Sequence, residues 1–136
     1  MKEWHGAAGI CINEDNAVLM VRGKESNAWA IPSGGIEEGE TPEACCIREL
    51  KEETGYTVQI KQELFAKETE IKGIAVKTYY FLVEKIGESS GINDPDFLIE
   101  EAAWKSLSDI KNLEHVYPED QKIMENIIRN QPLEEV

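Results

Sequence analysis

The sequence contains little positive charge, with 14 Lys and Arg against 27 Asp and Glu among 136 residues and a formal net charge of −13. Nonspecific binding to nucleic acid or to an anionic membrane needs a basic patch, so we expect neither a long nucleic acid nor a membrane as partner. No apolar run approaches the length of a membrane span. Residues 1–5 lack the apolar centre of a signal peptide, which favours a cytoplasmic location.

Cysteine is also scarce. Three cysteines are present, Cys11, Cys45 and Cys46, and two of them are adjacent, which does not suit a disulfide framework. We therefore expect the protein in a reducing compartment. The adjacent Cys45 and Cys46 invite a metal or redox role. We expect them instead to fill a close contact between a helix and a sheet as small apolar residues, since soft thiolates select zinc over magnesium.

The hydrophobic content and the length of the chain fit one globular domain over residues 1–136. Hydrophobic residues make up 41% of the chain, and a chain of this length buries roughly two thirds of its unfolded surface. There are no repeats, no low-complexity segments and no linker long enough to separate domains. A monomer and a homodimer both remain open.

Apolar alternation and turn residues predict several strands. A first strand at 6–12 is expected to pair as a hairpin with 17–21 across a polar turn, and further strands are expected at 58–69, 74–83 and 101–105. The stretch 22–28 reads as a polar loop, and 32–35 as a tight backbone feature. Strand pairing beyond the hairpin is left open.

Three helical segments are predicted among these strands. Thr41 as N-cap, Pro42 at the first position and Gly55 as a C-terminal stop define a helix over 42–54. One or two helical turns follow at 106–112, and a helix over 118–130 turns Ile123, Ile127 and Ile128 inward. A sheet with helices on both faces, an α/β (α+β) class, fits this order.

The helix over 42–54 carries a cluster of acids. Taking Glu49 as the origin, Glu52 lies about 60° to one side and Glu53 about 40° to the other. Like charges at these spacings destabilise a helix by roughly 0.2–0.5 kcal/mol per pair. A hard divalent cation such as Mg²⁺ or Mn²⁺, which prefers oxygen ligands, would compensate them. A solvated acidic helix face is the simpler alternative.

The stretch from Gly34 to Tyr56, GGIEEGETPEACCIRELKEETGY, meets every fixed position of the pattern G-x5-E-x7-R-E-U-x-E-E-x-G-U, where U is bulky and apolar. That pattern is the signature of the Nudix hydrolases, and this chain resembles that family. The flanking segments 29–32, Trp-Ala-Ile-Pro, and 101–104, Glu-x-x-Trp, are similar as well. The resemblance implies an α/β/α sandwich with a mixed central sheet. It also implies Mg²⁺-dependent hydrolysis, with Mn²⁺ as a substitute, of the pyrophosphate linkage between a nucleoside diphosphate and a group X.

The same resemblance assigns roles within the segment. It implies that Glu49, Glu52 and Glu53 are metal ligands and catalytic, and that Arg48 orients them through charge-assisted hydrogen bonds. The backbone carbonyl of Ser33, which stands where relatives usually have glycine, would join the metal ligands. Structural roles in the motif are implied for three further residues, Gly34, Glu40 and Gly55.

Two further groups of candidates lie outside the signature. Glu101 fits the place from which relatives draw another catalytic acid, although Asp94, Asp96 and Glu100 lie close by in the sequence. Arg22 and Lys24 precede the signature and are candidates for binding substrate phosphates, because an acidic site needs some basic group to meet the substrate. Ordinary surface charges are the alternative reading for all of these residues.

Two other functions compete with a hydrolase. A catalytically silent Nudix domain could bind a nucleotide as a sensor or regulator, but such domains typically lose signature glutamates that this chain keeps. A calcium-binding module fits poorly, because the acids lie within a helix and not at alternating loop positions. A small nucleotide is the expected substrate type. Nucleoside triphosphates, dinucleoside polyphosphates, nucleotide sugars and capped RNA ends all remain open.

Overall fold

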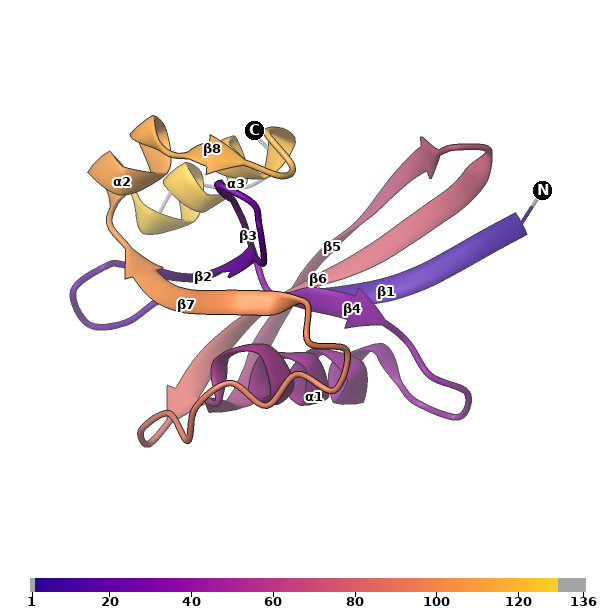
Figure 1. The fold of residues 1–136 in the computed structure, drawn as a ribbon, viewed down its shortest axis with the longest axis horizontal. Coiled ribbons are helices and arrows are strands. Elements are labelled where there is room, and N and C mark those ends of the chain that lie inside the picture. The colour runs from indigo at the N-terminus through magenta and orange to yellow at the C-terminus, as the bar shows by residue number, and fades with distance from the viewer. Residues whose placement is uncertain (1, 130–136) are drawn as a thin grey trace.

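The computed structural model describes residues 2–129, whose strands form two four-stranded mixed sheets (Figure 1). The first sheet has the order β4 (Ser33–Gly35), β1 (Lys2–Cys11), β6 (Ile74–Ile86), β5 (Thr57–Ile71). The second has the order β7 (Ile99–Lys105), β2 (Val18–Gly23), β3 (Ala28–Ala30), β8 (Glu114–His115). The helices are α1 (Pro42–Thr54), α2 (Leu107–Asn112) and α3 (Glu119–Ile128).

This architecture confirms the α+β class and corrects one pairing. Of the predicted hairpin between 6–12 and 17–21 only the turn is present, with the antiparallel bridge between Ile12 and Val18 and the Asn13 amide donating to the Ala17 carbonyl at 3.0 Å. The extended pairing is wrong, because β1 and β2 belong to different sheets. Strand β1 instead runs parallel to β6 along its whole length, and this pairing starts it at Lys2. The end predicted for the last helix, Asn130, lies outside the described residues.

Helix α1 has the ends that its local sequence predicts. The Thr41 hydroxyl accepts a hydrogen bond from the Ala44 amide at 3.1 Å, and Pro42 occupies the first turn. Gly55 ends the helix with a φ of 80°, a left-handed conformation that glycine adopts without steric cost. A side chain at Gly55 would also collide with the backbone of Gly91, so glycine is required there twice over.

Strand β1 separates the two cores of the molecule. Ala7 and Cys11 pack with α1, whereas Ala8 and Ile10 pack on the opposite side, in the core that α2 and α3 enter. Between them, a Cβ on Gly9 would collide with Leu50 and Cys46 of α1. The absence of a side chain at Gly9 therefore lets α1 lie close against the sheet.

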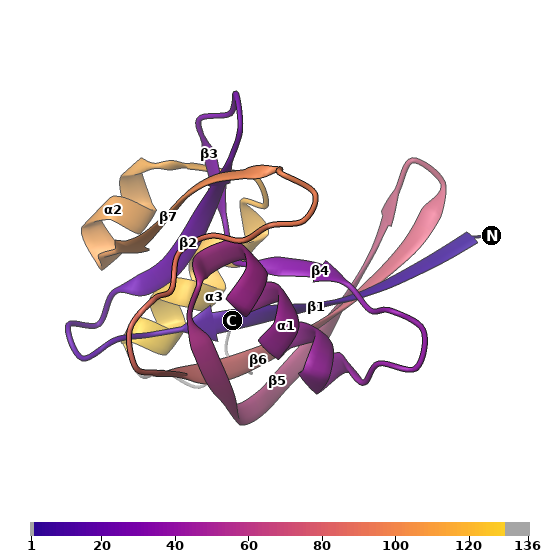
Figure 2. The ribbon, with the colours of Figure 1, turned by 60° about the horizontal axis from the view of Figure 1, so that its bottom comes forward.

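Helices α2 and α3 cover the other face, as Figures 1 and 2 show from two directions. Ile110 and Ile123 are buried there, and Ile127 and Ile128 pack against them, which confirms the inward face predicted for the last helix. Strands β1, β5 and β6 extend beyond the helices as a long arm (Figure 2). Within residues 2–129, no helix is both long enough and apolar enough to cross a membrane.

Candidate active site

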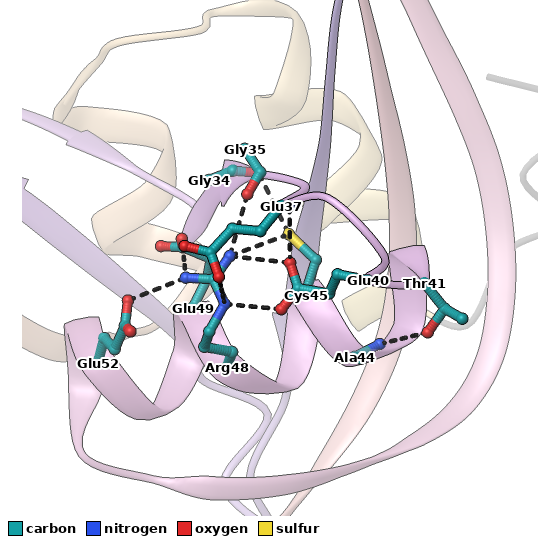
Figure 3. Close-up of polar contacts among 10 residues, drawn as sticks. All are labelled: Gly34, Gly35, Glu37, Glu40, Thr41, Ala44, Cys45, Arg48, Glu49 and Glu52. Atoms are coloured by element: carbon teal, nitrogen blue, oxygen red, sulfur yellow. Dashed lines mark hydrogen bonds and ion pairs between the residues drawn. The ribbon is translucent and has the colours of Figure 1, made fainter.

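Arg48 is the centre of a partly buried polar network between α1 and the loop that precedes it (Figure 3). Its Nε donates to Glu40 Oε2 at 2.7 Å, and its Nη1 donates to Glu49 Oε1 at 2.8 Å and to Glu52 Oε1 at 3.2 Å. Its Nη2 also donates to the Gly35 carbonyl oxygen at 3.0 Å. Arg48 therefore ties the loop before the helix to two of the three predicted metal ligands.

Glu40 has a structural position in this network. Its side chain is 13% exposed, and its Oε1 accepts the Glu37 amide at 3.0 Å. The hydrogen bond from Arg48 lowers the pKa of Glu40 to about 2, so this carboxylate stays ionised at neutral pH. It fixes the loop to the guanidinium of Arg48 and holds that guanidinium in place.

Glu49 and Glu53 form a carboxyl pair against strand β4. Glu53 is only 8% exposed, and burial raises its pKa well above the ordinary range, with the hydrogen bond and charge of Glu49 adding to the effect. The backbone of Ser33 hydrogen-bonds the Glu53 carboxyl and acts in the opposite direction. A side chain at Gly34 would collide with the Glu49 carboxyl, which explains the need for glycine there.

The donor set of this region fits a hard divalent cation. The polar atoms are carboxylate and backbone oxygens, the ligands that Mg²⁺ and Mn²⁺ prefer, and a cation would favour the ionised form of Glu53, which burial and the neighbouring Glu49 disfavour. Across residues 2–129, however, no three His, Cys, Asp or Glu side chains converge into a ready metal cage. Glu52 is directed to Arg48 instead (Figure 3), so the ligand trio stays a prediction.

A cleft of about 360 Å³, here called the acidic cleft, opens beside this pair. Strand β4, Glu49, Glu53, Asp94, Asp96 and Leu98 are among the residues that line it. Asp94 accepts the amides of Leu98 at 2.7 Å, Ile99 at 3.0 Å and Asp96 at 3.1 Å, so it organises the loop before β7. The Asp-Pro-Asp sequence signals such a turn, but not its position beside Glu53.

A larger cavity of about 500 Å³, here called the aromatic cavity, adjoins the cleft and shares Ile31, Ser33 and Tyr117 with it. Trp4, Tyr80 and Tyr117 contribute aromatic surface, and the arm formed by β5 and β6 supplies another wall. Sequence patterns gave no signal for a cavity here, because its walls come from four separate parts of the chain.

A buried carboxylate lies at the wall of the aromatic cavity. Asp120 is 3% exposed and accepts the Tyr80 hydroxyl at 2.9 and 2.8 Å. Lys67 Nζ lies 3.3 Å from Asp120 and 2.9 Å from Glu119. Burial raises the pKa of Asp120, while the positive charge of Lys67 opposes that shift. The sequence signal that could have predicted this buried carboxylate is the position of Asp120 on the same face of α3 as the apolar residues Ile123 and Met124.

Two of the candidates outside the signature, Arg22 and Glu101, contact each other. Arg22 of β2 and Glu101 of β7 are cross-strand neighbours, with Arg22 Nη2 3.2 Å from Glu101 Oε1. Arg22 Nη1 also donates to the Ser26 carbonyl at 2.9 Å. Lys24 Nζ lies 5.6 Å from the centre of the Phe97 ring. Their proposed contacts with substrate remain predictions.

Cys45 and Cys46 are fully buried against β1. Burial raises the pKa of each thiol to about 12, so neither is a thiolate at neutral pH. Their burial confirms the expectation that Cys45 and Cys46 act as small apolar packing residues between α1 and the sheet.

The NUDIX domain family model matches residues 3–127, and the chain belongs to this family. The 8-oxo-dGTP diphosphatase of Escherichia coli (strain K12) is 39% identical over 90 residues, covering 62% of this chain and 69% of that protein. Nudix hydrolase 25 of Arabidopsis thaliana is 51% identical over 49 residues, 35% of this chain and 28% of that one. The match to a relative from Bacillus subtilis (strain 168) likewise spans only 40% of that relative.

A solved NUDIX hydrolase from Nitrosomonas europaea superposes with a TM-score of 0.81. The superposition covers 99% of this chain and 96% of that one, at 23% sequence identity. It shows that the two chains share a fold and confirms the fold that the signature implied.

Proposed function

We propose that this protein hydrolyses the pyrophosphate linkage of a nucleoside diphosphate joined to a group X, with Mg²⁺ or Mn²⁺ as cofactor. The observation that carries the proposal is the Glu49–Glu53 pair beside β4, in which Glu53 is buried, has a raised pKa and lies against a second carboxyl. Family membership supports it, and so does the activity for which the Escherichia coli relative is named. A small nucleotide as substrate and a cytoplasmic location belong to the same proposal.

The proposed metal ligands are Glu49, Glu52, Glu53 and the Ser33 carbonyl. A divalent ion held there would neutralise phosphate oxygens and lower the pKa of a water molecule towards neutrality. Arg48 has the task of holding the carboxylates of Glu49 and Glu52 in orientation, since it donates a hydrogen bond to each. Glu53 stays close to β4 because the Ser33 backbone bonds its carboxyl.

The remaining roles follow from position and charge. Glu101 is proposed to orient or deprotonate the attacking water, and Arg22 and Lys24 are proposed to bind phosphates of the substrate. The aromatic cavity is proposed to hold the nucleoside, because its aromatic walls suit a base and it shares three lining residues with the acidic cleft. The phosphate chain would then pass from the cavity across the carboxyl pair.

The test is a substrate panel with Mg²⁺ or Mn²⁺, reading released phosphate, pyrophosphate and nucleoside monophosphate. The panel includes 8-oxo-dGTP and ordinary nucleoside triphosphates, dinucleoside polyphosphates, nucleotide sugars and capped RNA. We expect turnover of at least one small nucleotide that a chelator abolishes. Mn²⁺ binding with no turnover of any compound would favour the nucleotide-sensing alternative, and turnover indifferent to chelator would contradict the metal.

A further inference from the structure

Phe97, in the loop before β7, holds an aromatic ring in solvent on an unusual backbone. The residue is 72% exposed, the largest exposed fraction among the bulky hydrophobic side chains of the described residues. Its φ is 54°, a left-handed conformation that a bulky residue rarely adopts. Burial in the core does not explain this placement, and turn chemistry alone would favour glycine or asparagine here.

The loop around Phe97 is firmly anchored. Asp94 accepts three backbone amides from the loop, and the Lys24 amide donates to the Leu98 carbonyl at 2.9 Å. The Lys24 ammonium lies 5.6 Å from the centre of the Phe97 ring, within reach of a cation–π contact. One face of the ring thus has a positive charge beside it, in a protein of net charge −13.

The residues on either side of Phe97 line the acidic cleft, although Phe97 itself does not. Its two sequence neighbours, Asp96 and Leu98, both line the cleft together with Glu49 and Glu53. They belong to the part of the lining that the aromatic cavity does not share. A ligand whose phosphates cross the carboxyl pair from the aromatic cavity would therefore leave the cleft near Phe97 and Lys24.

We propose that Phe97 and Lys24 form an outer subsite that stacks on a planar aromatic part of the group X. Phe97 supplies the stacking surface, and Lys24 supplies positive charge for the last phosphate before that aromatic group. The preferred ligands are then two-ended nucleotides with an aromatic base at each end. This inference rests on the proposed function for the direction of the phosphate chain, but its test does not require turnover.

Equilibrium binding separates the outer subsite from the reaction. Calorimetry in Mg²⁺ compares methylene-bridged, non-hydrolysable diadenosine and diguanosine tetraphosphates with methylene-bridged ATP and GTP. We expect the wild-type protein to bind at least one two-ended analogue about tenfold more tightly than its one-ended counterpart, the upper range for one aromatic stack. Phe97→Ala should remove this preference, and Phe97→Trp should keep it.

The matched control is Ile86→Ala, which truncates another exposed hydrophobic residue, 51% exposed, at the far end of β6. It should leave both affinities unchanged, and thermal unfolding should show that all variants are folded. Equal affinity of the wild-type protein for both classes would overturn the outer subsite, as would an equal loss for both classes in Phe97→Ala. A preference that depends on Phe97 in a protein that turns over no natural nucleotide would retain the subsite and reject the hydrolase.

Discussion

The aromatic cavity and the acidic cleft are each lined by a buried carboxyl group, but the environments of the two carboxyl groups differ. In the aromatic cavity, Asp120 has the Tyr80 hydroxyl and the Lys67 ammonium within hydrogen-bonding distance. In the acidic cleft, Glu53 meets another carboxyl, that of Glu49, and a hydrogen bond from the Ser33 backbone favours the ionised form of Glu53. The buried carboxyl of the aromatic cavity is thus matched by a cationic side chain, and in the acidic cleft the proposed divalent ion would supply the corresponding charge.

From this difference we expect the aromatic cavity to contribute mainly to substrate binding and the carboxyl pair mainly to catalysis. Substitutions in the aromatic cavity should change the Michaelis constant, and those at the carboxyl pair should change the turnover number. Four substitutions, beginning with the largest expected effect, test that division and the Arg48 network that holds Glu49.

Replacing Glu53 with Gln should have the largest effect. We expect the turnover number to fall about 10³-fold, because the substitution removes an oxygen ligand from the proposed metal site. The same change should raise the stability of the metal-free protein by about 1 kcal/mol near neutral pH, since Glu53 must take up a proton to be buried there and Gln need not. Urea unfolding in chelator and steady-state kinetics in Mg²⁺ measure the two effects.

The matched control for that experiment is Glu43→Gln. Glu43 is an exposed acid in the first turn of the same helix, so its loss changes the net charge equally. Both effects should be absent in this variant. A Glu53→Gln enzyme with near-normal turnover would show that the carboxyl pair is not the catalytic centre.

Glu101→Gln should come next, with a turnover number about 10²-fold lower and little change in the Michaelis constant, if the residue acts on the attacking water. Its partner Arg22 provides the comparison, because Arg22→Ala breaks the same ion pair and should mainly raise the Michaelis constant. Similar small losses in both variants would assign the two residues to a structural pair, since exposed ion pairs contribute about 0–1 kcal/mol.

Trp4→Leu tests the aromatic cavity. It removes an aromatic wall while keeping apolar bulk, so the Michaelis constant should rise up to about tenfold with the turnover number within about twofold. Trp4→Phe keeps a ring and should stay close to the wild-type protein. A fall in turnover number without a change in the Michaelis constant would break the division between the two cavities.

Glu40→Gln should have the smallest effect, on stability and its pH dependence. The folded-state pKa of Glu40, about 2, lies below the ordinary 4.5, so its stabilisation is complete above pH 4.5 and disappears as the pH falls through 2. The wild-type protein should therefore exceed the variant by about 1 kcal/mol near neutrality and match it at the acid end. Urea unfolding between pH 2 and 7 measures this difference, and a constant difference would contradict the Arg48 contact.

Local chemistry explains what the sequence could predict. Thr41, Pro42 and Gly55 act within a turn of the helix ends, and α1 therefore has the predicted bounds. The Arg48–Glu52 contact joins residues four apart on one helix, and the signature also anticipated that Arg48 orients Glu49.

Contacts between distant residues explain what the sequence could not predict. The Tyr80–Asp120 bond joins residues 40 apart, and the Arg22–Glu101 bond joins residues 79 apart. No local pattern reports such pairings. The division of the strands into two sheets was missed for the same reason, since β1 pairs with β6 and not with its neighbour in sequence.

Gly9 carries no charge and lies in the middle of β1, yet it governs how near α1 can approach. Added bulk at that point would push against Leu50, which directly follows Glu49 in the helix, and against Cys46, one turn earlier. Such a displacement would move the Glu49 and Glu53 carboxyls away from β4 and distort the proposed metal site. An impaired enzyme could thus retain all of its ionisable groups, the defect lying in the spacing between a strand and a helix.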